Sequence, residues 1–182
     1  MIATAIENTK TAWLGEFPEH WQVLRIKNIV TVNDEALSEK TDEDFVVKYI
    51  DIGNVNSDGE INEIQEFKFV DTPSRGRRIL KKGDVIISTV RTYLKAITQI
   101  DFDVENHIAS TGFAVLRPKE NVTSDFLFYA VKAKYLIDSI MANSFGVSYP
   151  AINSSTSAPP LGVTPLPTLV TQYFNRIFFA LI

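Results

Sequence analysis

The fold of this chain is decided by the stretch Lys82-Gly83-Asp84-Val85-Ile86-Ile87-Ser88-Thr89-Val90-Arg91, near the middle of the 182-residue sequence. Gly83 and Asp84 give a turn signal, and the six residues after them are mostly β-branched. This composition predicts a strand over residues 85–90.

Two more runs predict strands around this one. Residues 45–52 (FVVKYIDI) are β-branched and aromatic and end at Gly53-Asn54, while residues 107–116 are similar but interrupted at Gly112. Several short strands separated by turn residues favour a sheet built from hairpins. We therefore expect an α+β (mixed α/β) domain with a curved, mostly antiparallel sheet and flanking helices.

The hydrophobic period changes after residue 123. From 124 to 143 the apolar residues fall at helical spacing, Thr123 or Ser124 can cap the helix, and Asp125 lies in its first turn. One helix is predicted there. Residues 34–44 are predicted to form a surface loop, residues 1–12 a flexible N-terminus, and residues 169–182 a further apolar helix.

Composition excludes several classes of protein. Hydrophobic residues make up 45% of the chain, enough for a packed core, and the absence of cysteine excludes disulfides and thiolate chemistry. We found no signal-peptide pattern and no long apolar run, so a cytoplasmic protein is expected.

Charge is unevenly distributed. The net charge is −4, but residues 68–95 carry eight basic and two acidic side chains, which leaves −10 for the rest. An acidic body with one basic segment suits a protein that presents one face to a polyanion. The alternative is an ordinary solvated surface.

Enzyme signatures are missing or weak. Neither the glycine-rich loop and Asn/Asp-Pro-Pro-aromatic turn of a base methyltransferase nor a phosphate-binding GxxxxGK[ST] loop is present. Glu66 and Lys68, with Asp58 upstream, have residue types found in metal nucleases, but an exposed strand explains them better. His20 and His107 are more readily explained by packing than by metal binding. We expect no catalytic residues, no metal and no cofactor.

Two polar segments are candidate DNA contacts. Arginine can bind guanine edges, lysine binds phosphates, and hydroxyls donate to phosphate oxygens. The first set is Arg75, Arg77, Arg78, Lys81, Lys82, Ser88, Thr89, Arg91, Thr92, Tyr93 and Lys95. The second set is Asn143, Ser144, Ser148, Tyr149 and Asn153. The alternatives are a basic edge hairpin for the first segment and an ordinary connecting loop for the second.

Five motifs in order resemble the specificity subunits of type I restriction-modification enzymes. They are Trp13-Leu14-Gly15-Glu16-Phe17-Pro18-Glu19-His20-Trp21, Tyr49-Ile50-Asp51-Ile52-Gly53-Asn54-Val55, the opening stretch 82–91, Ser110-Thr111-Gly112-Phe113-Ala114-Val115-Leu116-Arg117-Pro118, and Gly146-Val147-Ser148-Tyr149-Pro150-Ala151-Ile152-Asn153.

The resemblance implies that residues 13–168 form one DNA target-recognition domain that reads half of a split site in double-stranded DNA. It also implies a non-catalytic subunit of a phage-defence system, which directs methyltransferase and restriction subunits.

The C-terminal segment departs from the family pattern. Residues 169–182 resemble only the start of the family's spacer helix, which predicts a truncated helix and a possible homodimer. The alternative hypothesis is a truncated relic that pairs through this apolar segment without productive DNA binding.

Overall fold

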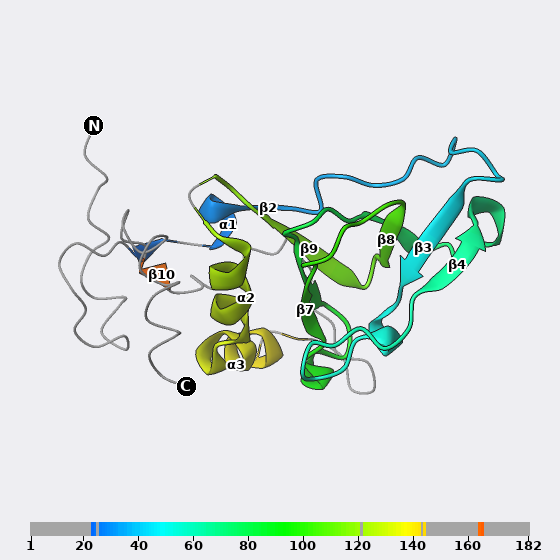
Figure 1. Ribbon diagram of the computed structural model, residues 1–182. Coiled ribbons are helices and arrows are strands. Elements are labelled where there is room, and N and C mark those ends of the chain that lie inside the picture. Colours follow the sequence, from blue (N-terminus) through cyan, green and yellow to red (C-terminus); the bar gives the residue numbers. More distant parts are fainter. Residues whose placement is uncertain (1–22, 25, 121, 143, 145–163, 166–182) are drawn as a thin grey trace.

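The computed structural model describes residues 23–24, 26–120, 122–142, 144 and 164–165 (Figure 1). Its strands are β1 (Val23–Leu24), β2 (Val30–Val32), β3 (Val46–Ile50), β4 (Gln65–Lys68), β5 (Gly76–Ile79), β6 (Val85–Ser88), β7 (Ile97–Gln99), β8 (His107–Ser110), β9 (Phe113–Pro118) and β10 (Thr164–Pro165). Its helices are α1 (Ile26–Ile29), α2 (Ser124–Lys132), α3 (Lys134–Ala142) and the short 3-10 helices η2 (Ile52–Asn54), η3 (Phe69–Asp71) and η4 (Thr92–Leu94).

The strands form two four-stranded sheets and one short pair. The first sheet has the order β2-β9-β6-β7 and the second β4-β3-β8-β5, while β1 pairs with β10. Every pairing is antiparallel except that of β3 with β8. The predicted α+β class with mostly antiparallel strands is confirmed, although the strands divide between two sheets.

Alternation along β6 builds the layers. Val85 packs in a core shared with the helices, the helix-side core, and Ile87 packs against this core. Ile86 points the other way and packs in a second core, between the two sheets. Successive side chains of a strand point to opposite faces, so one apolar run serves both cores. Figure 1 shows α2 and α3 beside the first sheet and β3, β4 and β8 at the other end of the molecule.

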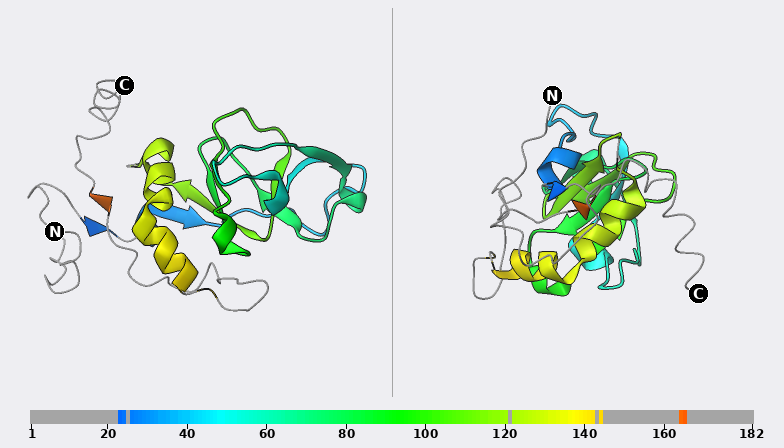
Figure 2. Two further views of the ribbon diagram at one scale, coloured as in Figure 1. Left: turned by 90° about the horizontal axis from the view of Figure 1, so that it is seen from below. Right: turned by 90° about the vertical axis from the view of Figure 1, so that its left-hand side faces the viewer.

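β9 follows the same pattern. Ala114 and Leu116 join the helix-side core, while Phe113 and Val115 join the core between the sheets. The helix-side core also takes Leu127 of α2 and Leu136 of α3, both buried. The first sheet is therefore covered on both faces, as the turned views in Figure 2 indicate.

The predicted strands are confirmed with small changes. Residues 45–52 contain β3, residues 85–90 contain β6, and residues 107–116 divide into β8 and β9 around Thr111 and Gly112. Residues 34–44 form the predicted loop.

The single helix predicted over 124–143 is wrong. The structure has α2 and α3 with a break at Ala133, whose backbone is not helical (φ −59°, ψ 135°). The predicted N-cap is confirmed, since the Thr123 hydroxyl accepts a hydrogen bond from the Phe126 amide at 3.3 Å.

Candidate nucleic-acid interface

The ends of three strands meet on one edge of the domain. β3 and β8 are parallel, so both end on the same side of the second sheet. β9 begins just after the β8–β9 turn, and its start pairs with the end of β6, which brings the end of β6 to the same edge. Two backbone hydrogen bonds connect the loops there, from the Thr89 amide to Gly112 (2.8 Å) and from the Thr111 amide to Arg75 (2.7 Å). We call this region the strand-end surface, defined by Arg75, Thr89, Arg91, Tyr93, Lys95 and Thr111.

The loop between β6 and β7 is the most strained part of this surface. Arg91 (φ 52°) and Lys95 (φ 53°) flank η4 in the left-handed region. Among the described residues, every other positive φ belongs to asparagine or glycine, which tolerate it. A left-handed arginine or lysine costs about 1–2 kcal/mol, and such strain tends to occur at functional sites.

Buried hydroxyls anchor this loop. The Thr92 hydroxyl lies 3.0 Å from the Ser144 hydroxyl, which also donates to the Ile140 carbonyl of α3 at 2.8 Å. The Ser88 hydroxyl donates to the Val90 carbonyl. Ser88 and Thr92 are thus buried and serve the loop's internal structure, so the prediction that their hydroxyls face a DNA duplex is wrong.

The Thr92–Ser144 contact also joins the two candidate DNA-contact segments. They lie about fifty residues apart in sequence, yet Ser144 at the start of the second segment touches η4 in the first. The other candidates of the second segment, Asn143, Ser148, Tyr149 and Asn153, lie outside the described residues, as do His20 and residues 169–182.

Arg75 and Thr89 lie at the same edge but already have protein partners. The Arg75 guanidinium pairs with Asp51 at 3.1 Å, and its pKa is raised by the Tyr49 hydroxyl and by Asp51. The Thr89 hydroxyl donates to the Gly112 carbonyl at 2.9 Å. Arg75 remains exposed, so one edge of its guanidinium can still meet an anion.

Arg77 and Arg78 lie on β5, an edge strand of the second sheet, and both are half-buried. Arg77 covers the Phe69 ring at 4.8 Å from its centroid. The Nε atom of Arg78 is buried and has no hydrogen-bond partner in the described part of the chain. The Leu37 amide donates to the Arg77 carbonyl at 2.8 Å, so residues of the 34–44 loop cover part of this edge. Because β5 and β6 belong to different sheets, the segment does not form the basic edge hairpin of the alternative interpretation.

Lys81 and Lys82 lie at the opposite end of β6. At about 3.3 Å per residue, the strand separates Lys82 from Thr89 by roughly 20 Å. Both lysines are exposed but paired, Lys81 with Glu35 and Lys82 with Asp103 at 2.9 Å. The basic segment of the sequence is therefore not one continuous surface.

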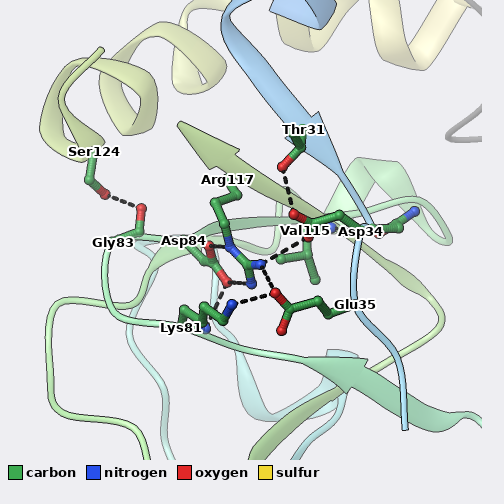
Figure 3. Close-up of polar contacts among 10 residues, drawn as sticks. Thr31, Asp34, Glu35, Lys81, Gly83, Asp84, Val115, Arg117 and Ser124 are labelled. Carbon is green, nitrogen blue, oxygen red and sulfur yellow. Dashed lines mark hydrogen bonds and ion pairs between the residues drawn. The ribbon is translucent and has the colours of Figure 1, made fainter. Parts of the chain in front are cut away.

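A buried ion pair that was not predicted from the sequence fixes this opposite end. Arg117 donates through Nε and Nη2 to the two Asp84 oxygens at 2.8 and 2.9 Å (Figure 3). The Lys81 amide adds a third hydrogen bond to Asp84 at 2.7 Å. The carboxylate of Asp84 raises the pKa of Arg117, and Nη1 of Arg117 reaches Glu35 at 2.9 Å. This geometry is that of a structural clamp.

No catalytic arrangement is found in the described part of the chain. His107 is buried against Phe102, and its Nδ1 accepts the Glu105 amide, so the predicted packing role is confirmed. No group of three His, Asp or Glu residues there could hold a metal ion. No helix among the described residues is long and apolar enough to cross a membrane.

Comparison with known proteins agrees with the sequence motifs. The model of the "Type I restriction modification DNA specificity domain" family matches residues 18–156, most of the chain. This chain belongs to that family. The specificity subunit of the type I restriction enzyme HindI from Haemophilus influenzae is 32% identical over 84 residues, which cover 45% of this chain and 18% of the relative.

Two solved structures share the fold. The HsdS subunit from Thermoanaerobacter tengcongensis matches with a TM-score of 0.73 and 28% identity, covering 86% of this chain and 40% of that one. A chain from a structure of complex assembly and conformational transition in a type I R-M system matches with a TM-score of 0.75 and 26% identity, covering 91% and 44%. This chain spans less than half the length of each of these relatives.

Proposed function

We propose that this chain is a non-catalytic, sequence-specific reader of double-stranded DNA that recognises one half-site for a type I restriction-modification system. Its family membership and the strand-end surface support this role. The observation that carries the proposal is the Thr92–Ser144 contact, because it brings Ser144, the described residue of the second candidate segment, against η4 in the first.

The chemistry of the strand-end surface suits a duplex. Arg75, Arg91 and Lys95 are exposed cations that neutralise phosphates, and arginine can also fork onto guanine in the major groove. Exposed Thr111 adds a hydroxyl without adding charge, and Tyr93 adds an exposed aromatic ring. In the second segment we assign DNA contacts to Asn143, Ser144, Ser148, Tyr149 and Asn153, which follow α3 in sequence.

Cations away from this edge are assigned smaller roles. Lys81 and Lys82 are held by acidic partners at the far end of β6, so we expect them to contribute little to binding. Arg77 and Arg78 on β5 lie just beyond Arg75 and would contact DNA only at the margin of the surface.

The partners follow from the same role. We assign the methylation and cleavage reactions to methyltransferase and restriction subunits that this chain directs, acting in the cytoplasm. Residues 13–168 would be the recognition domain and residues 169–182 the start of a helix that pairs with another chain, another copy of this one included.

A selection experiment tests the proposal with two matched variants. A randomised duplex pool is bound, recovered and sequenced at low and at moderate salt. The variant Arg91→Gln/Lys95→Gln alters the strand-end surface, and Lys81→Gln/Lys82→Gln removes the same charge at the far end of β6. We expect the wild type and the far-end variant to enrich the same short motif, and the strand-end variant to lose it. Failure to enrich any motif, or equal enrichment by all three proteins, would contradict the proposal.

A further inference from the structure

Two consecutive apolar side chains are exposed at the tip of the β6–β7 loop. Tyr93 is 49% exposed and Leu94 41% exposed, both within η4. Among the exposed large hydrophobic residues of the described chain, they alone are neighbours in sequence. Single exposed apolar residues are normal, but an adjacent pair held on a strained loop calls for an explanation.

The loop holds this pair in place. The buried Thr92 side chain anchors η4 to Ser144, and the buried Ala96 accepts the Ser88 amide at 2.9 Å. Within the loop, the Leu94 amide donates to the Arg91 carbonyl at 2.8 Å and the Lys95 amide to Thr92 at 3.1 Å. A backbone that is already positioned loses little conformational entropy on binding.

Charge on both sides of the pair identifies its partner. Arg91 and Lys95 directly bracket η4, and both are exposed. An apolar protein surface would have to desolvate these cations, whereas a nucleic-acid duplex offers phosphates on either side of stacked bases. Proteins that bend DNA combine these features, inserting apolar side chains between base pairs while cations hold the backbone.

We propose that Tyr93 and Leu94 form an apolar wedge that inserts at a base step of the bound duplex, with Arg91 and Lys95 holding the flanking phosphates. This inference rests on the proposed DNA-binding function and adds DNA distortion to it. Insertion unstacks the two base pairs of the step, and the free-energy cost of unstacking depends on which bases they are. Tyr93 and Leu94 therefore contribute specificity without hydrogen-bonding to a base edge.

The test compares an intact short duplex with the same duplex carrying a central T·T mismatch. The base pairs at a mismatch are already partly unstacked, so inserting a wedge there costs less free energy. A protein with such a wedge therefore binds the mismatched duplex more tightly. Affinity is measured at low salt for the wild type, for Tyr93→Ala/Leu94→Ala, and for Val70→Ala. Val70 is 59% exposed on η3, and its amide bonds to Glu43 near the start of β3, away from the strand ends.

We expect the wild type and Val70→Ala to bind the mismatched duplex about tenfold more tightly than the intact one. The Tyr93→Ala/Leu94→Ala variant should bind both duplexes equally, with an unchanged salt dependence because no charge is removed. Binding without a mismatch preference in the wild type, or a preference that survives in this variant, would overturn the wedge and leave the proposed function standing. Failure of the wild type to bind either duplex would overturn both.

Discussion

Removal of the Arg117 guanidinium should destabilise the domain far more than loss of a surface ion pair. In the variant Arg117→Met, the Asp84 carboxylate loses two hydrogen bonds of 2.8 and 2.9 Å and, among the described residues, keeps the one from the Lys81 amide. The Asp84 side chain is 1% exposed, so water cannot replace them. Breaking a buried pair in this way costs about 3–5 kcal/mol, out of a total stability of about 5–15 kcal/mol for a typical domain.

A matched surface pair provides the control. The Lys68 and Asp44 side chains are 56% and 82% exposed, so Lys68→Met should cost less than about 1 kcal/mol. Arg117→Lys keeps the charge but not the two-pronged geometry, and should fall between the two. Urea unfolding followed by far-ultraviolet circular dichroism gives each free energy of unfolding. A loss for Arg117→Met no greater than that for Lys68→Met would refute the structural clamp.

Three further predictions concern the fold. Gly59→Ala should lower the free energy of unfolding in urea by at least about 1–2 kcal/mol, because φ is +93° and the new Cβ would lie 2.6 Å from the Ile97 carbonyl oxygen. The control Gly53→Ala has open space around the new Cβ and should change the free energy of unfolding little. Equal effects of the two substitutions would be inconsistent with this turn geometry. Burial lowers the pKa of His107 below its ordinary 6.5. Below pH 6.5 the unfolded chain therefore binds a proton more readily than the folded chain does. The free energy of unfolding should fall as the pH drops from 6.5 through the folded pKa. A nuclear magnetic resonance titration, assigned with His107→Gln, would contradict this if His107 titrated at or above 6.5. Thr123→Ala should lower the free energy of unfolding by about 1 kcal/mol through loss of the N-cap, and an unchanged unfolding curve would show that the cap contributes nothing.

The strands β3, β6, β8 and β9 were predictable from their β-branched and aromatic composition, whereas the short strands β2, β4, β5 and β7 were not predicted. The helix break required arithmetic on the helical period. Leu136 lies nine positions after Leu127, which is two and a half turns at about 3.6 residues per turn. An uninterrupted helix would thus place these two core residues on opposite sides. The break at Ala133 resets the phase, so that both reach the helix-side core. The signal was present in the sequence, although neither glycine nor proline marks the position.

The candidate site was only partly predictable, since charge was counted along the chain and not in space. The predicted strand over residues 85–90 already implied that Lys82 and Thr89 lie at its two ends. The acidic partners of Lys81 and Lys82, Glu35 and Asp103, come from other segments, and no local pattern pairs them. The Thr92–Ser144 contact is likewise a product of tertiary packing by α3.

The salt dependence of DNA affinity tests the central claim most directly. One duplex is titrated over a range of salt concentrations against the wild type and two variants, Arg91→Gln/Lys95→Gln and Lys81→Gln/Lys82→Gln. Each phosphate that the protein neutralises contributes about 0.9 to the slope of log K against log salt. If the strand-end surface holds the duplex, the first variant should lose about 1.8 from the slope and the second almost nothing. Equal slopes for all three proteins, or a loss confined to the Lys81/Lys82 variant, would show that DNA binds elsewhere.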